Sequence, residues 1–195
     1  CYEYFSSKWS VLKGIKINAN KAEAEDSLFT LISENINTID SIETLNLLGG
    51  EPLLQKQNHK LIDLLPNKNY YILTNLSIDL PNNTIAPKLI ANPNAGWGVS
   101  FDTVGDRFEY VRHGAEWNTF VSNLRYLHSQ GPKLINAHPL YCTYSALNLC
   151  EYYDFIINEG YFDGVYWCAI QNIRSLNVFN LPLQFKRKAL AELDR

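Results

Sequence analysis

Residues 45–54 read LNLLGGEPLL and join two kinds of sequence. The first part belongs to a short apolar run, 42–48, that is typical of a buried strand, and the last part restarts as a helix. A turn between the two needs one glycine at most, whereas this one holds two glycines, a carboxylate and a proline. The stretch therefore raises the question of whether the turn is only structural or also chemical.

Strand-like and helical patterns alternate outward from this stretch. A proline-rich segment with Pro81, Pro87 and Pro93 gives no clear helical pattern, but elsewhere the alternation is regular. Since parallel strands need crossover helices, this alternation predicts one α/β domain with a parallel sheet covered by helices. The periodicity of apolar residues does not decide between a doubly wound sheet and a barrel. We expect strands over 42–48, 70–73, 97–101, 133–144 and 164–169, helices over 21–39, 59–65, 116–129 and 147–159, and a last helix opened by Pro182.

Polar side chains gather directly after four of the predicted strands. In parallel α/β folds the active site lies at the carboxyl ends of the strands, so this concentration is the first functional signal. The residues are Glu51 after the first strand, Thr74 and Asn75 after the second, Ser100 and Asp102 after the third, and Thr143 and Ser145 at the end of the fourth.

The composition excludes several function classes. The 195 residues are 46% hydrophobic and 19% charged with a net charge of −3, which is a globular composition without an electrostatic footprint for nucleic acid. No apolar run approaches the roughly 20 residues that span a bilayer, and no signal peptide is visible. We expect a cytoplasmic protein without nucleic-acid or membrane partners.

The ends and the cysteines suggest a fragment. The chain opens on Cys1, contains no methionine and stops inside the helical run LQFKRKALAELDR, so we interpret residues 1–195 as one domain of a longer protein, incomplete at the N-terminus and truncated at the C-terminus. Four cysteines without a CxxC pair indicate reduced thiols or a metal role, and we expect Cys142, Cys150 and Cys168 to be buried thiols. The four histidines lack zinc-site spacing. We expect Trp97, Trp117 and Trp167 in the core.

The turn itself has two interpretations. In the structural one, Gly49 supplies a positive φ, Gly50 allows close packing, Pro52 begins a helix and Glu51 favours its N-terminus. In the chemical one, two glycines admit a ligand to the backbone, and a carboxylate with exposed carbonyls receives a small cation such as an ammonium. Phosphate is a poor fit because it requires N–H donors and a lysine.

The GGEP sequence and its neighbours resemble radical SAM enzymes of the twitch/SPASM type. In that superfamily GGEP receives the amino group of S-adenosylmethionine (SAM). Five further motifs agree in order and spacing, and together they cover most of the chain. They are Cys1 with 6–9 (SSKW), which resembles the third cysteine of CxxxCxxC and the following stretch; 73–77 (LTNLS); 99–102 (VSFD); 109–117 (EYVRHGAEW); and 143–148 (TYSALN).

The resemblance implies a partial (β/α)6 TIM-like barrel whose first strand lies outside the fragment. It implies a [4Fe-4S] cluster with Cys1 as one of three thiolates, and SAM as cofactor. Glu51 with the backbone of Gly49 and Gly50, followed by Pro52, would take the SAM ammonium. Thr74 and Asn75 would line the floor of the site, and Ser100 would reach the carboxylate or ribose. Asp102 would reach the ribose or nearby polar groups, and Arg112 the carboxylate, which its planar fork matches.

The implied activity is reductive cleavage of SAM to a 5′-deoxyadenosyl radical that abstracts a substrate hydrogen, with an external electron donor and a peptide or protein as the first substrate class to consider. The fragment alone would be inactive, because two cluster cysteines are absent from it. Thr103 replaces the usual glycine after "SxD". Two alternatives stay open: a non-catalytic relative that binds SAM or a peptide, and an ordinary barrel in which GGEP is only a turn.

Overall fold

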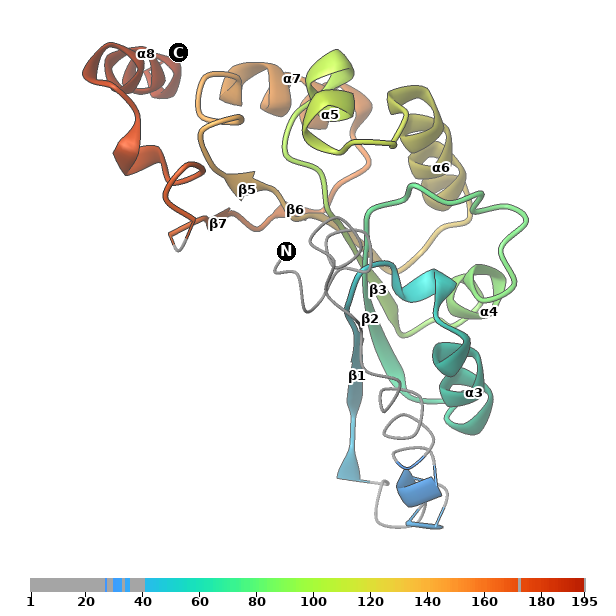
Figure 1. The fold of residues 1–195 in the computed structure, drawn as a ribbon. Helices are drawn as coiled ribbons and strands as arrows, with labels where there is room; N and C mark the ends of the chain where they lie inside the picture. The colour runs from blue at the N-terminus through green and yellow to red at the C-terminus, as the bar shows by residue number, and fades with distance from the viewer. Residues whose placement is uncertain (1–26, 28–29, 33, 36–40, 172, 195) are drawn as a thin grey trace.

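The computed structural model describes residues 27, 30–32, 34–35, 41–171 and 173–194. In this part of the chain five parallel strands form one sheet in the order β1-β2-β3-β4-β6 (Figure 1). The predicted α/β class, with the parallel sheet of a partial TIM-like barrel, is confirmed. The strands of this sheet are β1 (Thr44–Leu47), β2 (Asn69–Thr74), β3 (Ala95–Val99), β4 (Leu134–Ala137) and β6 (Gly164–Val165).

Helices connect successive strands, as the crossover rule requires. The predicted helices over 59–65, 116–129 and 147–159 are present with slightly different bounds. The elements are the 3-10 helix η3 (Pro52–Leu54), α3 (Lys56–Leu64), α4 (Ala86–Ile90), α5 (Gly105–Val111), α6 (Trp117–Ser129), α7 (Leu149–Glu159), η4 (Val178–Asn180) and α8 (Leu183–Leu193).

The core lies between the sheet and the helices that cover one of its faces. In Figure 1 helices α3, α4 and α6 lie on the same side of β1–β3. Strand residues alternate between the two faces, so Ile72, Trp97 and Ile135 point toward the helices and are buried there. The prediction that the tryptophans belong to the core is confirmed for Trp97, whereas Trp117 and Trp167 are half-buried and pack against the core. The opposite, inner face carries Tyr71 and other half-buried side chains.

Two predicted strands are interrupted. The strand expected over 133–144 ends at Ala137 because Pro139, which has no N–H to donate, follows it. The chain resumes as β5 (Leu140–Tyr141), which pairs with β7 (Cys168–Ala169) in a separate two-stranded sheet. The strand expected over 164–169 is divided in the same way between β6 and β7.

Two helices were not predicted, and one prediction falls largely outside the described residues. Helix α4 forms within the proline-rich segment, with Pro87 in its first turn where the missing N–H costs nothing. Helix α5 contains a single buried residue, Phe108, which is too little for an apolar periodicity. Of the helix expected over 21–39, only residues 27, 30–32, 34 and 35 are described.

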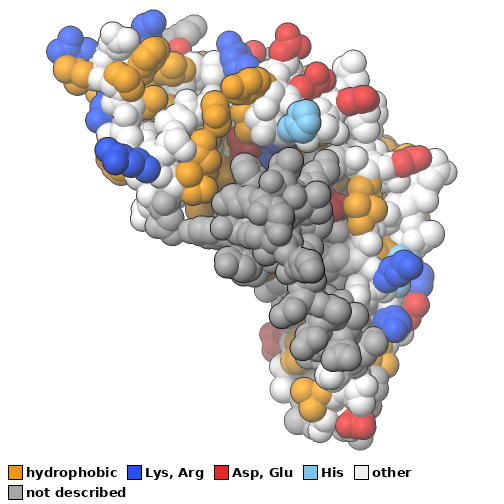
Figure 2. Space-filling model, viewed as in Figure 1, with side chains coloured by type: hydrophobic (Ala, Val, Ile, Leu, Met, Phe, Trp, Pro, Cys, Tyr) orange, Lys and Arg blue, Asp and Glu red, His pale blue; other side chains and the backbone are white. Residues whose placement is uncertain are grey.

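The three described cysteines differ in burial. Cys142 is buried, as predicted, and Cys150 is half-buried. The prediction is wrong for Cys168, which is exposed on β7 at the edge of its small sheet. Figure 2 shows hydrophobic side chains gathered near α7 and α8, where Leu183 and Leu190 are exposed. No helix in the described part of the chain is long and apolar enough to cross a membrane.

Candidate functional site

The Glu51 carboxylate is fixed at the carboxyl ends of β1 and β2. Glu51 has an extended backbone and caps η3: its Oε1 accepts a hydrogen bond from the Leu53 N–H at 3.2 Å. The Thr74 hydroxyl lies 2.9 Å from both carboxylate oxygens, and the Asn75 N–H donates to Oε2 at 3.0 Å. The structure therefore brings Glu51, Thr74 and Asn75 together, as their positions after neighbouring strands predict.

Burial makes this carboxylate unusual. Glu51 is only 9% exposed, and its desolvation raises the pKa of the carboxyl above the ordinary 4.5, although the bonds from Asn75, Thr74 and Leu53 oppose this shift. An ionised carboxylate offers about four lone-pair sites. Three donors from the described residues occupy three of them, so one acceptor site has no donor within the described part of the chain. A cation at that site would also favour the ionised form.

The segment after β2 holds the Thr74 hydroxyl in place. Besides donating to Glu51, this hydroxyl accepts a bond from the Leu76 N–H at 3.0 Å. Leu76 is fully buried and has a φ of 51°, a left-handed conformation that is rare for a bulky residue. The Asn75 side chain bonds the Ser77 N–H and hydroxyl, so only its backbone N–H is directed to Glu51. The chain thus accepts local strain next to the carboxylate.

The two glycines of GGEP have different structural needs. Gly49 has a φ of +133°, and a Cβ built there would lie 2.6 Å from Gln55 Nε2. Gly50 has no positive φ, and apart from its two chain neighbours no atom of the described residues lies within 4 Å of a Cβ built on it. The turn therefore explains Gly49 and leaves Gly50 without a structural reason.

The expected set of free carbonyls is only partly present. The Pro52 carbonyl accepts the Asn58 side-chain amide at 2.8 Å, and the Glu51 carbonyl accepts the Leu54 N–H at 3.1 Å, so the expectation is wrong for both. Pro52 itself is buried as the first residue of η3. Within the described residues, no hydrogen bond reaches the carbonyls of Gly49 and Gly50. Within the described part of the chain, those two carbonyls are therefore the ones without a hydrogen-bond donor.

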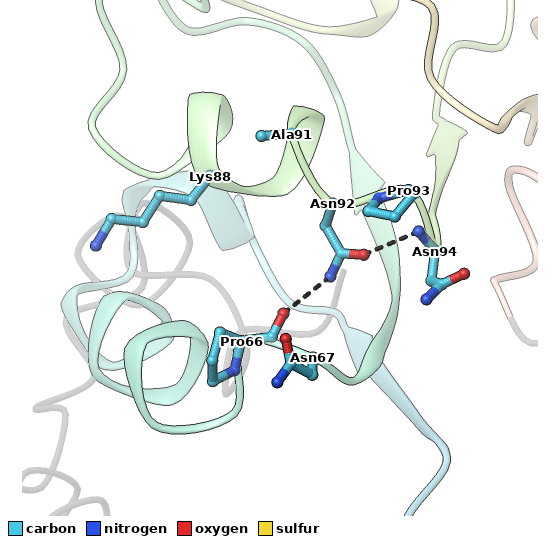
Figure 3. Close-up of a pocket in the computed structure, with 7 residues that line it drawn as sticks. All are labelled: Pro66, Asn67, Lys88, Ala91, Asn92, Pro93 and Asn94. Atoms are coloured by element: carbon cyan, nitrogen blue, oxygen red, sulfur yellow. Dashed lines mark hydrogen bonds between the residues drawn. The ribbon is translucent and has the colours of Figure 1, made fainter.

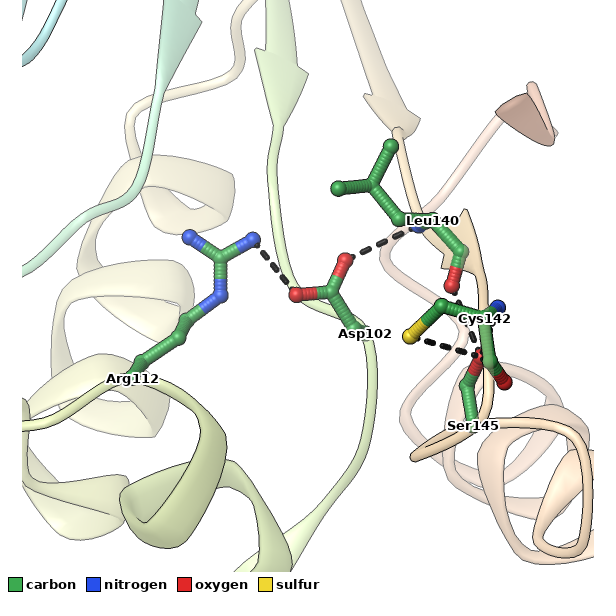
Figure 4. Close-up of polar contacts among 5 residues, drawn as sticks. All are labelled: Asp102, Arg112, Leu140, Cys142 and Ser145. Atoms are coloured by element: carbon green, nitrogen blue, oxygen red, sulfur yellow. Dashed lines mark hydrogen bonds and ion pairs between the residues drawn. The ribbon is translucent and has the colours of Figure 1, made fainter. Parts of the chain in front are cut away.

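A second group of predicted residues follows β3 (Figure 4). Asp102 accepts a hydrogen bond from Arg112 Nη2 at 3.0 Å and, through its other oxygen, from the Leu140 N–H at 2.9 Å. Ser100 is half-buried beside β2, with its N–H donating to the Thr74 carbonyl at 2.8 Å. Asp102 thus joins the end of α5 to the start of β5, and Ser100 lies between the two groups.

Several buried polar atoms near this ion pair have no hydrogen-bond partner among the described residues. They are Thr103 Oγ1, Arg112 Nε and the Tyr152 hydroxyl. Burial and the negative charge of Asp102 raise the pKa of Tyr152, so that hydroxyl stays neutral. Unpaired buried polar atoms are rare and indicate a bound water or ligand group. Thr103, which replaces the usual glycine, thus has a buried, unpaired hydroxyl next to Asp102, which motif matching alone would not show.

Ser145 and Thr143 serve the structure. The Ser145 hydroxyl donates to the Leu140 carbonyl at 2.7 Å and accepts from the Cys142 N–H at 3.0 Å (Figure 4). The Thr143 hydroxyl donates to the Ser175 carbonyl at 3.2 Å. These three hydrogen bonds hold the loop after β5. Ser145 and Thr143 are therefore turn residues.

The predicted cluster ligand Cys1 and the 6–9 stretch lie outside the described residues. Within the described part of the chain, no group of three or more His, Cys, Asp or Glu side chains could hold a metal ion. The described residues therefore include those predicted to contact SAM, and the predicted ligand of the [4Fe-4S] cluster is not among them. The cluster stays a prediction.

A hollow at the opposite, amino edge of the sheet does not resemble a site (Figure 3). It lies between the loops before β2 and β3, and the Asn92 side chain spans it. The Asn92 amide donates to the carbonyls of Pro66 (3.4 Å) and Lys68 (3.0 Å), and its oxygen accepts from the Asn94 N–H at 2.8 Å. These bonds tie the two loops together and leave the Asn92 side chain no role in binding.

The fold is shared with solved structures of SAM-bound and peptide-bound proteins. Streptococcus suis SuiB bound to the precursor peptide SuiA matches 87% of this chain and 38% of its own, with a TM-score of 0.62 and 14% identity. SuiB bound to S-adenosylmethionine matches 77% of this chain and 36% of its own, with a TM-score of 0.58 and 15% identity. Native anSMEcpe with bound AdoMet and Kp18Cys peptide matches 77% of this chain and 45% of its own, with a TM-score of 0.58 and 15% identity.

These matches confirm the predicted resemblance at the level of the fold. The chain spans less than half of the length of either protein. No protein-family model and no curated protein sequence matches the chain. The roles of the individual site residues therefore stay predictions.

Proposed function

We propose that this chain, which has the fold of the SAM-bound SuiB and anSMEcpe structures, is the core of a radical SAM enzyme that acts on a peptide or protein. The order and spacing of its motifs support the chemistry, and the peptides named with both proteins support the substrate class. The activity, the substrate and the electron donor belong to the whole protein, of which this chain is the SAM-binding part.

The observation that carries the proposal is the buried Glu51 carboxylate with one acceptor site left. Three chain donors orient it at the edge where parallel folds bind ligands, and the open carbonyls of Gly49 and Gly50 lie next to it in sequence. An ammonium brings three donors and a positive charge. It would thus satisfy the carboxylate and both carbonyls, and it would offset the desolvation of Glu51.

The Asp102–Arg112 pair suits the opposite end of the SAM amino-acid moiety. Asp102 engages Arg112 through Nη2, and Nη1 makes no hydrogen bond within the described residues. Since the Arg112 side chain is 22% exposed, its free nitrogen can donate to a carboxylate. Ser100, half-buried between the two groups, is placed to bind the same carboxylate or the ribose.

Cys1 would supply one thiolate of a [4Fe-4S] cluster, whose other two thiolates come from sequence before it. When bound, the cluster and SAM supply a 5′-deoxyadenosyl radical that removes a hydrogen atom from the substrate. The contribution of this chain is to orient SAM by its ammonium and carboxylate, because positioning of the reacting group is what the protein adds to cofactor chemistry.

Anaerobic reconstitution of the full-length protein with iron and sulfide, followed by an assay for 5′-deoxyadenosine with dithionite as reductant, tests the proposal. We expect 5′-deoxyadenosine from the wild type and none from Cys1→Ala. A fully reconstituted cluster with SAM bound but uncleaved would contradict the radical reaction and favour the non-catalytic alternative. Absence of SAM binding would contradict both.

A further inference from the structure

Three polar side chains meet on the inner face of the sheet, opposite the helices. Tyr71 of β2 reaches across β3, and its hydroxyl lies 2.6 Å from His138 Nε2, just after β4. The Asn136 amide of β4 donates to the same hydroxyl at 3.4 Å. We call Tyr71, Asn136 and His138 the inner-face cluster. No step proposed above uses it.

Glycines in the neighbouring strands make this contact possible. A Cβ built on Gly98 of β3 would lie 3.0 Å from the Tyr71 hydroxyl and 3.0 Å from His138 Cδ2. A Cβ built on Gly164 of β6 would lie 3.1 Å from Asn136 Oδ1. Glycine inside a strand weakens it and often marks a site where another group approaches the backbone. Here the two glycines provide the space in which the cluster forms.

The hydrogen bonds favour one tautomer of His138. If Nε2 carried the ring proton, the Tyr71 hydroxyl would accept from both His138 and Asn136, and its own proton would have no acceptor among the described residues. If Nε2 is instead the acceptor, the Tyr71 proton is satisfied as well, so we take this arrangement as part of the inference. Burial lowers the pKa of His138 below the ordinary 6.5, so the imidazole is neutral near pH 7. In the neutral ring the proton therefore lies on Nδ1, which is a donor.

Two polar atoms of the cluster have no hydrogen-bond partner among the described residues. They are Nδ1 of the half-buried His138 and Oδ1 of Asn136, which is 3% exposed. One is a neutral donor and the other a neutral acceptor. Tyr166, 58% exposed, stacks on the His138 ring with a centroid distance of 5.4 Å and adds an aromatic surface beside them.

We infer that the inner-face cluster binds an amide group of the substrate, with His138 Nδ1–H donating to its carbonyl oxygen and Asn136 Oδ1 accepting from its N–H. A carboxylate would leave the Asn136 oxygen without a donor, and an ammonium would leave the His138 N–H without an acceptor. The inference rests on the proposed function, in which the substrate is a peptide or protein, and it identifies three residues that position it.

The test is an NMR titration of the protein with N-acetylglycine N-methylamide as a peptide-bond probe, observed at the histidine ring nitrogens. The free protein should show His138 as the Nδ1–H tautomer, and the probe should shift its signals saturably. Tyr71→Phe and His138→Gln should weaken probe binding about tenfold, as expected when a hydrogen-bonded positioning contact is lost. Tyr70→Phe is the matched control, because the adjacent Tyr70 hydroxyl bonds the Leu65 carbonyl on the helix side.

The inference is overturned if the wild type shows no saturable shift, or if Tyr71→Phe and His138→Gln bind the probe as the wild type does. SAM affinity is measured on the same samples. Binding of SAM without any response to the probe would contradict this inference alone, whereas a response to the probe without SAM binding would support it and contradict the proposed function.

Discussion

Substituting Glu51 by glutamine separates the proposed SAM contact from the structural role of this residue. The change keeps the shape of the side chain and removes its charge. If the SAM ammonium occupies the remaining acceptor site, the variant loses a charge-assisted hydrogen bond worth about 1.5–3 kcal/mol. Since 1.4 kcal/mol corresponds to a factor of ten, SAM affinity should fall roughly 10- to 150-fold.

The cost in stability should be smaller. Glu51 accepts backbone N–H bonds through both oxygens, from Leu53 and from Asn75. A glutamine amide can accept only one of them, and leaving the other N–H unpaired costs about 1–3 kcal/mol. Removal of a desolvated charge, which is what raises the pKa of Glu51, offsets part of that cost. We expect a drop of about 1–2 kcal/mol, or roughly 2–8 °C in Tm for a chain of this size.

The raised pKa of Glu51 gives this prediction a pH dependence with two opposite signs. A group whose pKa is higher in the folded state stabilises the fold fully below its unfolded value, here about 4.5, and this contribution is lost as the pH rises through the folded pKa. The stability of the free protein should therefore decrease across that window. SAM affinity should increase across the same window, because the ammonium requires the ionised carboxylate. Both trends should be absent from Glu51→Gln.

Isothermal titration calorimetry with SAM, combined with thermal unfolding at each pH, measures both quantities. Glu159→Gln is the matched control, because Glu159 ends α7 at the other edge of the sheet and pairs with Arg125. It should bind SAM as the wild type does. If a folded Glu51→Gln binds SAM within twofold of the wild type, the assigned role of Glu51 is refuted.

Three further substitutions test the rest of the site. Gly50→Ala should leave the free energy of unfolding within about 0.5 kcal/mol of the wild type, because the added Cβ meets no described atom beyond its chain neighbours. The same variant should weaken SAM binding in calorimetry. Unchanged SAM binding would contradict a role of Gly50 in the site. Thr74→Val should lower Tm by roughly 2–8 °C and SAM affinity about three- to tenfold, since its hydroxyl orients Glu51; a wild-type Tm would contradict this. Arg112→Gln should lower the free energy of unfolding in urea by about 2–3 kcal/mol, because Asp102 loses its charged partner. The double variant Asp102→Asn/Arg112→Gln should recover part of that loss. Strictly additive effects of the two substitutions would contradict the coupling of the two residues.

The sequence predicted the Glu51 group because its residues lie at the ends of adjacent parallel strands. Such ends meet at one edge whatever the details of packing, so placing Thr74 and Asn75 beside Glu51 required only the strand order. The pairing of Asp102 with Arg112 could not be derived in the same way. Arg112 follows α5, a helix with one buried residue and no apolar period to reveal it.

The inner-face cluster was missed for a related reason. Its residues alternate with core residues of β2 and β4 that face the helices, and a strand pattern alone does not show which side chains of neighbouring strands meet on the other face. The glycines of AGWGV were the available signal, because two glycines in a central strand imply a close approach from neighbouring strands. Pro139, which has no N–H to donate, is the sequence signal for the break of the fourth strand.

The central claim is that SAM binds at the carboxyl edge of the sheet with its amino group on Glu51. A crystal structure of the protein in complex with SAM tests this directly. The account predicts the SAM amino nitrogen within about 3 Å of a Glu51 carboxylate oxygen, while the bonds from Thr74 and Asn75 to that carboxylate are retained. SAM bound elsewhere, or at this edge with its amino group away from Glu51, would contradict it.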